Sequence, residues 1–214
     1  MEEIIYRDRL QNVITEAQAS QLEEYDKYYL ENNEVVRFEK FSKHPRRRGG
    51  GYYLKPDENV QDYIDQYVTP IGIWMFYYNK QTNAYGHTAW DFILYHDNVI
   101  KGKRKECYTA QNELLAMIDL NIETEEPKFG VKYYYNPDYY LPELLPELIS
   151  FSYKPNSKYE PISIRINNSK LGDPDKVYTP EEYQTMPKVM AVLPLDQSSY
   201  YHDILPVLPT NPIT

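Results

Sequence analysis

The chain has 214 residues, of which 42% are hydrophobic and 15% aromatic, enough to bury a core in one large domain or two small ones. Its net charge of −9 argues against a general nucleic-acid binder, because phosphate contacts need a basic surface, and favours basic proteins as partners. The single cysteine, Cys107, excludes an internal disulfide and a thiolate metal cluster built by one chain.

The N-terminal sequence and the hydropathy of the chain show neither a secretory signal nor a membrane-spanning segment. Met1 to Arg7 lacks the basic and apolar regions of a secretory signal. No apolar run approaches about 18 residues, the length that a membrane-spanning helix needs. We therefore expect a cytoplasmic protein without a membrane span.

The first 42 residues predict a helix and a hairpin that compete for the same tyrosines. Thr15 to Gln18 has the form of a capping box, and apolar residues follow at helical spacing, which predicts a helix over roughly 16–27. Within residues 35–41, Val36 and Phe38 alternate with Arg37 and Glu39, as in a strand. If the chain instead forms a hairpin that turns near residues 31–34, Tyr28 and Tyr29 belong to its first strand.

Residues 43–51 are the most irregular part of the sequence, with a proline, three arginines and three glycines. This composition predicts a mobile loop. Its arginines are Arg46, Arg47 and Arg48. They precede Tyr52-Tyr53 and would suit a nucleic-acid backbone with a stacked base. Because the whole chain is acidic, we favour a solvated loop or a patch that meets an acidic surface on a partner.

The middle of the chain predicts a second hairpin. A helix is expected over roughly 57–68, followed by strands at 71–78 and 84–96 that flank a polar turn. Residues 104–109 extend the same sheet, and 111–120 has apolar residues at helical spacing.

The second half predicts further strands at 129–135, 149–153 and 162–166. Residues 141–148 contain regularly spaced prolines and permit only a short or kinked helix. Thr179-Pro180-Glu181-Glu182 combines an N-cap with a proline at the first helical position.

These elements predict an α+β fold in which antiparallel hairpins form a meander sheet, with a few short helices and an extended proline-rich C-terminal tail. The acidic connector near residue 121 suggests a boundary between a hairpin-rich region, 1–120, and a second α+β portion, 121–192. The tail, 193–214, packs in cis or reaches a neighbour.

No catalytic or metal-binding constellation survives inspection of the sequence. On a strand, His87 and Asp91 would face one side and His96 the other, so the three cannot converge on one ion. Cys107 lies in an expected strand without the glycine elbow that presents a nucleophile. We predict a non-enzyme without a metal or cofactor.

Tyrosine is the most distinctive residue, with 24 copies, many of them doubled or tripled. In a strand, neighbouring rings face opposite sides, so one of each pair must meet solvent or a partner, and exposed tyrosines are common interface anchors. The predicted partner-binding residues are Tyr133, Tyr134, Tyr135, Asp138, Tyr139 and Tyr140, assisted by Glu123, Glu125 and Glu126.

Residues 25–40 and, more loosely, 74–79 with 88–92 resemble the tyrosine-rich hairpin unit of small cytoplasmic immunity proteins of polymorphic and contact-delivered toxin systems. The resemblance implies a non-catalytic protein that binds and occludes a cognate toxin, which the acidic charge suggests is basic. The alternative is a structural component of a phage or other large assembly, whose arginine loop and tail order on neighbouring subunits.

Overall fold

The computed structural model describes residues 3–44, 48–68, 72–136, 138, 149–154, 160–193 and 199–210. These residues are mostly strand with a few short helices, which confirms the α+β class. The sheet is open and mostly antiparallel, and no helix of the described residues is long and apolar enough to cross a membrane.

Among the described residues, thirteen strands are hydrogen-bonded in the order β13-β12-β11-β10-β9-β8-β7-β6-β5-β4-β3-β1-β2, so that most strands pair with their neighbours in sequence. The strands are β1 (Glu3–Arg7), β2 (Val13–Ile14), β3 (Glu24–Glu31), β4 (Glu34–Ser42), β5 (Gly49–Tyr53), β6 (Ile73–Thr82), β7 (Thr88–His96), β8 (Val99–Tyr108), β9 (Leu114–Leu120), β10 (Pro127–Tyr134), β11 (Ile149–Tyr153), β12 (Pro161–Ile166) and β13 (Val177–Tyr178). The helices are α1 (Glu16–Ala19), α2 (Val60–Tyr67), α3 (Pro180–Gln184), α4 (Pro187–Met190) and the 3-10 helix η4 (Ser199–Tyr201).

The chain divides into two compact units. Unit 1 comprises residues 1–80 and 90–103, and unit 2 comprises 81–89 and 104–214, so β6, β7 and β8 contribute residues to both. The sequence boundary expected at 120/121 falls in the turn between β9 and β10, inside unit 2.

Unit 1 has an aromatic core beneath α2. β5 and β6 are parallel, and α2 lies in the segment that connects them, as a parallel crossover requires. Tyr52 is 2% exposed and lies between the rings of Tyr63 and Tyr67 of α2 and the side chain of Phe76 in β6. The predicted helix over 57–68 is thereby confirmed, with Asn59 as its N-cap.

The prediction of a mobile loop over 43–51 is wrong for its glycines. Gly49, Gly50 and Gly51 begin β5 and are buried between β4 and β6. Because these glycines have no Cβ, aromatic rings pack directly against their backbone. The Phe38 ring occupies the space where a Cβ of Gly51 would lie, and the Trp74 ring lies 3.0 Å from a Cβ built on Gly50. Aromatic rings over glycines restore the packing that a glycine strand lacks.

Two expected helices are replaced by strands. Instead of running over 16–27, α1 ends at Ala19, because residues 24–31 pair with β1 and β4 on either side. Residues 114–120 form β9 rather than part of a helix. Leu115 and Ala116 are both buried although their side chains face opposite sides of the strand, so β9 lacks the alternation of buried and exposed residues that marks a one-sided strand. Its apolar residues happen to be spaced as they would be on one face of a helix.

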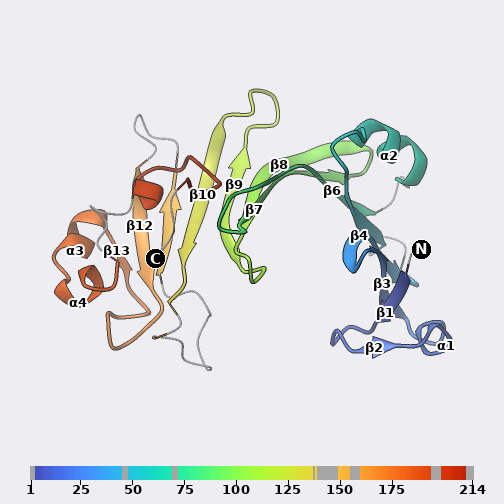
Figure 1. Cartoon of the computed structure of the whole chain (residues 1–214), viewed down its shortest axis with the longest axis horizontal. Coiled ribbons are helices and arrows are strands. Elements are labelled where there is room, and N and C mark those ends of the chain that lie inside the picture. Colours follow the sequence, from blue (N-terminus) through green and yellow to red (C-terminus); the bar gives the residue numbers. More distant parts are fainter. Residues whose placement is uncertain are drawn as a thin grey trace. The chain divides into compact units, whose positions relative to one another are not determined.

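Unit 2 places its C-terminal segment, 199–210, in the core. Tyr201 and Ile204 are 0% exposed and belong to the same apolar cluster as Phe151 of β11. Helices α3 and α4 lie beside β12 and β13 (Figure 1), and the predicted capping box at Thr179 is formed. The described part of the tail therefore packs against the sheet of its own chain.

A buried lysine fixes this segment to the sheet. Lys132 of β10 is 0% exposed, and its Nζ donates hydrogen bonds to the carbonyl oxygens of Tyr200, Asp203 and Pro206 at 2.6, 2.8 and 2.9 Å. Nζ also lies 3.9 Å from the centroid of the Tyr200 ring. Burial lowers the pKa of the Lys132 ammonium from 10.5 to about 7, while the nearby Asp203 carboxylate opposes this shift.

Candidate partner-binding surface

The predicted tyrosine anchors are largely engaged within unit 2. Tyr134 is 3% exposed, so the prediction that its ring is exposed is wrong; Tyr133 and Tyr135 are half-buried. The Tyr135 hydroxyl donates a hydrogen bond to the carbonyl of Leu114 at 2.7 Å. Asp138 is exposed, whereas Tyr139 and Tyr140 lie outside the described residues.

The acidic residues do not join these tyrosines. Glu123, Glu125 and Glu126 are exposed in the turn that precedes β10, whereas Tyr134 ends that strand. Eight residues of β-strand separate the two groups by roughly 25 Å at about 3.3 Å per residue. Among the residues that the structure describes, these glutamates and tyrosines are therefore not brought together.

Of the predicted basic loop, Arg46 and Arg47 lie outside the described residues. Arg48 is exposed, its Nε donates a hydrogen bond to the carbonyl of Ser42 at 2.8 Å, and its Cζ lies 5.2 Å from the centroid of the Phe41 ring. Tyr52, which the sequence placed beside the arginines as a stacking ring, is instead buried in the core.

A different surface of unit 1 has the character of an interface. Seven of the eight residues of β3 are half-buried and one is buried, so both faces of this strand remain partly accessible to solvent. Its neighbours β1 and β4 are mostly half-buried or exposed as well. Half-buried aromatic rings on an accessible sheet are typical of binding surfaces.

One face of this sheet gathers cations and rings. Side chains alternate along a strand, and residues paired by register across strands share a face. The resulting surface, which we call the cationic face, comprises Tyr6, Tyr25, Lys27, Tyr29, Arg37, Glu39 and Phe41.

The cations of this face lie against its rings. Lys27 Nζ is 4.7 Å from the centroid of the Tyr29 ring and 5.7 Å from that of Tyr6. Arg37 Cζ is 3.6 Å from the Tyr29 centroid. A hydrogen bond with Tyr29 is the main cause of a raised pKa at Lys27, which is therefore charged at neutral pH.

An aromatic pair continues the cationic face toward Arg48. The Tyr25 and Phe41 rings are stacked with their centroids 4.7 Å apart, and the Tyr6 ring lies 6.1 Å from that of Tyr25. The Tyr6 hydroxyl donates to Glu16 of α1 at 3.0 Å. Ring pairs of this kind add about 0.5–1.5 kcal/mol beyond area burial, so the face is preorganised rather than loose.

The opposite face of the same sheet also has cations beside aromatic rings, but with only one stacked ring pair. Tyr28 and Phe38 are stacked at 5.9 Å between centroids, Arg7 Cζ lies 5.5 Å from the Tyr28 ring, and Lys40 Nζ lies 6.0 Å from the Phe38 ring. Because Phe38 is buried against Gly51, this face offers less ring surface to a partner.

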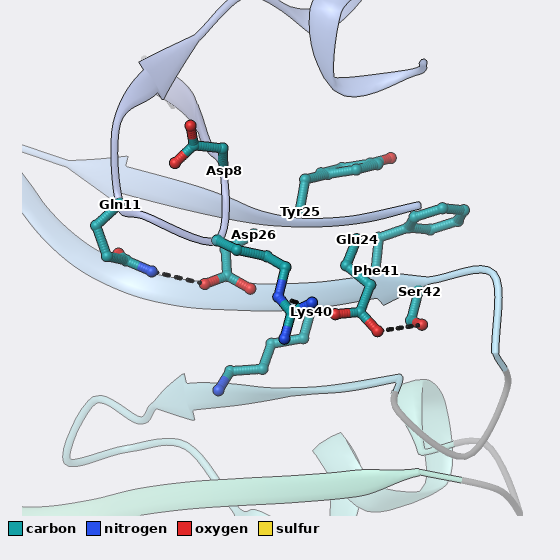
Figure 2. Close-up of a pocket in the computed structure, with 9 residues that line it drawn as sticks. Asp8, Gln11, Glu24, Tyr25, Asp26, Lys40, Phe41 and Ser42 are labelled. Atoms are coloured by element: carbon teal, nitrogen blue, oxygen red, sulfur yellow. Dashed lines mark hydrogen bonds and ion pairs between the residues drawn. The ribbon is translucent and has the colours of Figure 1, made fainter. Parts of the chain in front are cut away.

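A cleft of about 260 Å³ opens beside the loop that joins β1 to β2 (Figure 2). The Asp26 carboxylate accepts a hydrogen bond from Gln11 Nε2 at 3.3 Å, and Glu24 accepts one from Ser42 Oγ at 3.3 Å. Tyr25 and Phe41 also line it, but their rings point to the other side of β3 and β4 from the Glu24 and Asp26 side chains. Its full lining is Asp8, Arg9, Gln11, Glu24, Tyr25, Asp26, Lys40, Phe41 and Ser42.

Polar contacts hold the loop and the acidic side chains beside the cleft. Its loop is held by Asp8, whose carboxylate accepts hydrogen bonds from the backbone amides of Leu10 and Asn12 at 2.9 Å. Hydrogen bonds from Asn12 are the main cause of a lowered pKa at Asp8. Glu24 is paired with Arg9 at 3.3 Å.

The histidines and the cysteine are dispersed. Asp91 accepts a hydrogen bond from Asn79 at 2.8 Å, and His96 Nδ1 lies 3.3 Å from Asp97. Cys107 is 0% exposed, and burial raises the pKa of its thiol to about 12, which favours the protonated thiol at neutral pH. In the part of the chain that the structure describes, no group of three His, Cys, Asp or Glu side chains could hold a metal ion.

The sequence contained a signal for the cationic face that the tyrosine count obscured. Tyr25, Lys27 and Tyr29 alternate along one strand, and Arg37, Glu39 and Phe41 alternate along the next. Once residues 31–34 are taken as the turn, these two rows fall on one face.

No protein-family model, curated protein or solved structure matches this chain.

Proposed function

We propose that this protein acts by binding another protein through the β1–β3–β4 sheet of unit 1. The observation that supports this most directly is the cationic face, where tyrosine and arginine side chains are held in place yet remain partly accessible. Tyrosine and arginine dominate the energetics of protein interfaces, because both bury a large area at a small ordering cost.

The specific role that we propose is that of an immunity protein which binds and occludes a cognate toxin. The segment that resembles the hairpin of such proteins, residues 25–40, coincides with β3 and β4, the strands that build most of the cationic face. Binding by occlusion requires no catalytic group on this chain, only a preformed surface.

The proposal is tested with the protein encoded by the neighbouring gene. We expect a stable complex and, if that protein is toxic, neutralisation of its toxicity when both are expressed together. Tyr25→Ala should weaken the complex by about 2 kcal/mol or more, which is roughly 30-fold in Kd, because it removes one ring of the Tyr25–Phe41 stack.

The matched control is Tyr85→Ala, which removes an equally large ring that is 44% exposed in unit 2. It should leave the complex unchanged. Absence of binding to any protein encoded beside this chain would rule out the immunity role, and equal losses for both variants would rule out the proposed surface.

A further inference from the structure

The charge of the cationic face opposes that of the chain. The whole protein carries −9, yet the face holds Lys27 and Arg37 against Glu39, and Arg48 adds a third cation where its guanidinium meets Phe41. Arg37 and Glu39 are paired at 4.0 Å, and the Glu16 carboxylate accepts a hydrogen bond from Tyr6, so Lys27 and Arg48 exceed the remaining acid by one positive charge. A partner that covers this face therefore meets positive charge, whatever the net charge predicts.

The spacing of the side chains adds a constraint on the shape of the partner. Tyr25, Lys27 and Tyr29 alternate along β3, so their side chains recur about every 7 Å. An extended segment that runs along this face presents its own alternate side chains at the same spacing. One side chain can reach the Lys27 ammonium while its alternate neighbour packs on the Tyr25–Phe41 stack.

Resting on the proposed function, we infer that the cationic face binds an extended segment of the partner protein in which acidic and apolar side chains alternate. Carboxylates of the segment pair with Lys27 and Arg48, whose positions over rings restrict their movement. Apolar side chains of the segment cover Tyr25 and Phe41, whose rings are half-buried before binding. Complementary charge at such a surface sets the register and speeds association.

A protein segment fits this face better than a nucleic acid. The Glu39 carboxylate lies opposite Lys27 on the same face, and the Glu16 carboxylate accepts a hydrogen bond from the Tyr6 hydroxyl. A continuous phosphate backbone that ran along the face would meet these carboxylates. A short segment with separated acidic residues can place its charges on Lys27 and Arg48 and avoid them.

The test uses three probes on the intact protein, followed by NMR of its tyrosine and phenylalanine rings. The probes are a capped peptide of alternating glutamate and leucine, the same peptide with lysine in place of glutamate, and a thymidine pentanucleotide. The glutamate peptide should shift the signals of Tyr6, Tyr25 and Phe41, and Lys27→Gln should weaken its binding about fivefold, the value of an accessible charge pair. Higher salt should weaken it as well.

The control Lys101→Gln removes an exposed lysine elsewhere in unit 1 and should not change the affinity. Equal or tighter binding of the lysine peptide or of the pentanucleotide at these rings would overturn the inference, as would no shift with the glutamate peptide. If the glutamate peptide fails while Tyr25→Ala still breaks the complex with the neighbouring protein, the inference falls and the proposed function stands.

Discussion

Among single residues, Lys132 shows how a buried ionisable side chain can hold two segments of a chain together by hydrogen bonds. A lysine is almost never fully buried unless its ammonium has partners, and here three backbone carbonyls and a tyrosine ring supply them. The carbonyls belong to residues 200–206, so one side chain holds the C-terminal segment against β10.

Replacing Lys132 with methionine should therefore destabilise unit 2. The methionine fills a similar volume but donates no hydrogen bond, which leaves three carbonyl oxygens without this donor at a net cost of roughly 2–4 kcal/mol. Urea unfolding measures the change. Lys128→Met, at an exposed position on the same strand, should alter stability by less than about 0.5 kcal/mol.

Chemical rescue distinguishes a cage for an ammonium from simple packing. Lys132→Ala leaves the carbonyl oxygens in place with space between them, so ethylammonium should recover part of the lost stability, whereas sodium at equal concentration should not. Equal effects of the two cations would show that the carbonyls do not select an ammonium group.

Lys132 also predicts a dependence of stability on pH. Its pKa in the folded protein is lowered to about 7 from 10.5, so between these values the unfolded chain binds more protons than the folded one. Stability should therefore rise with pH above 7, by up to about 1.4 kcal/mol per pH unit. The free energy of unfolding, measured from pH 7 to 8.5, should show this rise in the wild type relative to Lys132→Met, and parallel curves would contradict it.

At the scale of elements, the structure shows where sequence patterns are sufficient and where tertiary contacts decide. The hairpin formed by β6 and β7 and the capping box of α3 follow from local signals, and both are present. The glycine strand β5 does not follow from local signals, since glycines next to arginines suggest a loop. Only the rings of Phe38 and Trp74, which are distant in sequence, make a buried strand there favourable.

We predict that one of two glycine substitutions in unit 1 is destabilising and the other is neutral. A Cβ at Gly49 would overlap the carbonyl oxygen of Ile73 in the neighbouring strand, so Gly49→Ala must displace backbone and should cost about 2–4 kcal/mol. At Gly102 the nearest atom would be Leu94 Cβ at 3.8 Å, so Gly102→Ala should be neutral within about 0.5 kcal/mol. Thermal unfolding of the two variants compares them, and similar losses would mean that β5 is not packed as described.

At the scale of the whole molecule, the two units each have an apolar core of their own. The core of unit 2 includes Phe151, Tyr201 and Ile204, and that of unit 1 is centred on Tyr52 and Phe76. The sequence could predict the fold class and most of the strands, because alternation is a local property. The sequence could not predict how the residues divide between the two cores, or that tyrosines 133–135 make contacts within unit 2, because both depend on long-range packing.

Separate cores predict separate responses to mutation. Lys132→Met should increase amide hydrogen exchange in β10 and β11 while exchange in β4 and β5 stays unchanged, and Gly49→Ala should do the reverse. Equal increases in both sets of strands for either variant would show that the chain opens as a single cooperative unit.

Hydrogen exchange of the complex with the protein encoded beside this chain would locate the binding surface that we propose on the β1–β3–β4 sheet. We predict that binding slows amide exchange in residues 3–7 and 24–42, with the largest change around Tyr25 and Lys27. Protection confined to the acidic turn at 123–126 and to residues 133–138, with β3 and β4 unchanged, would contradict it.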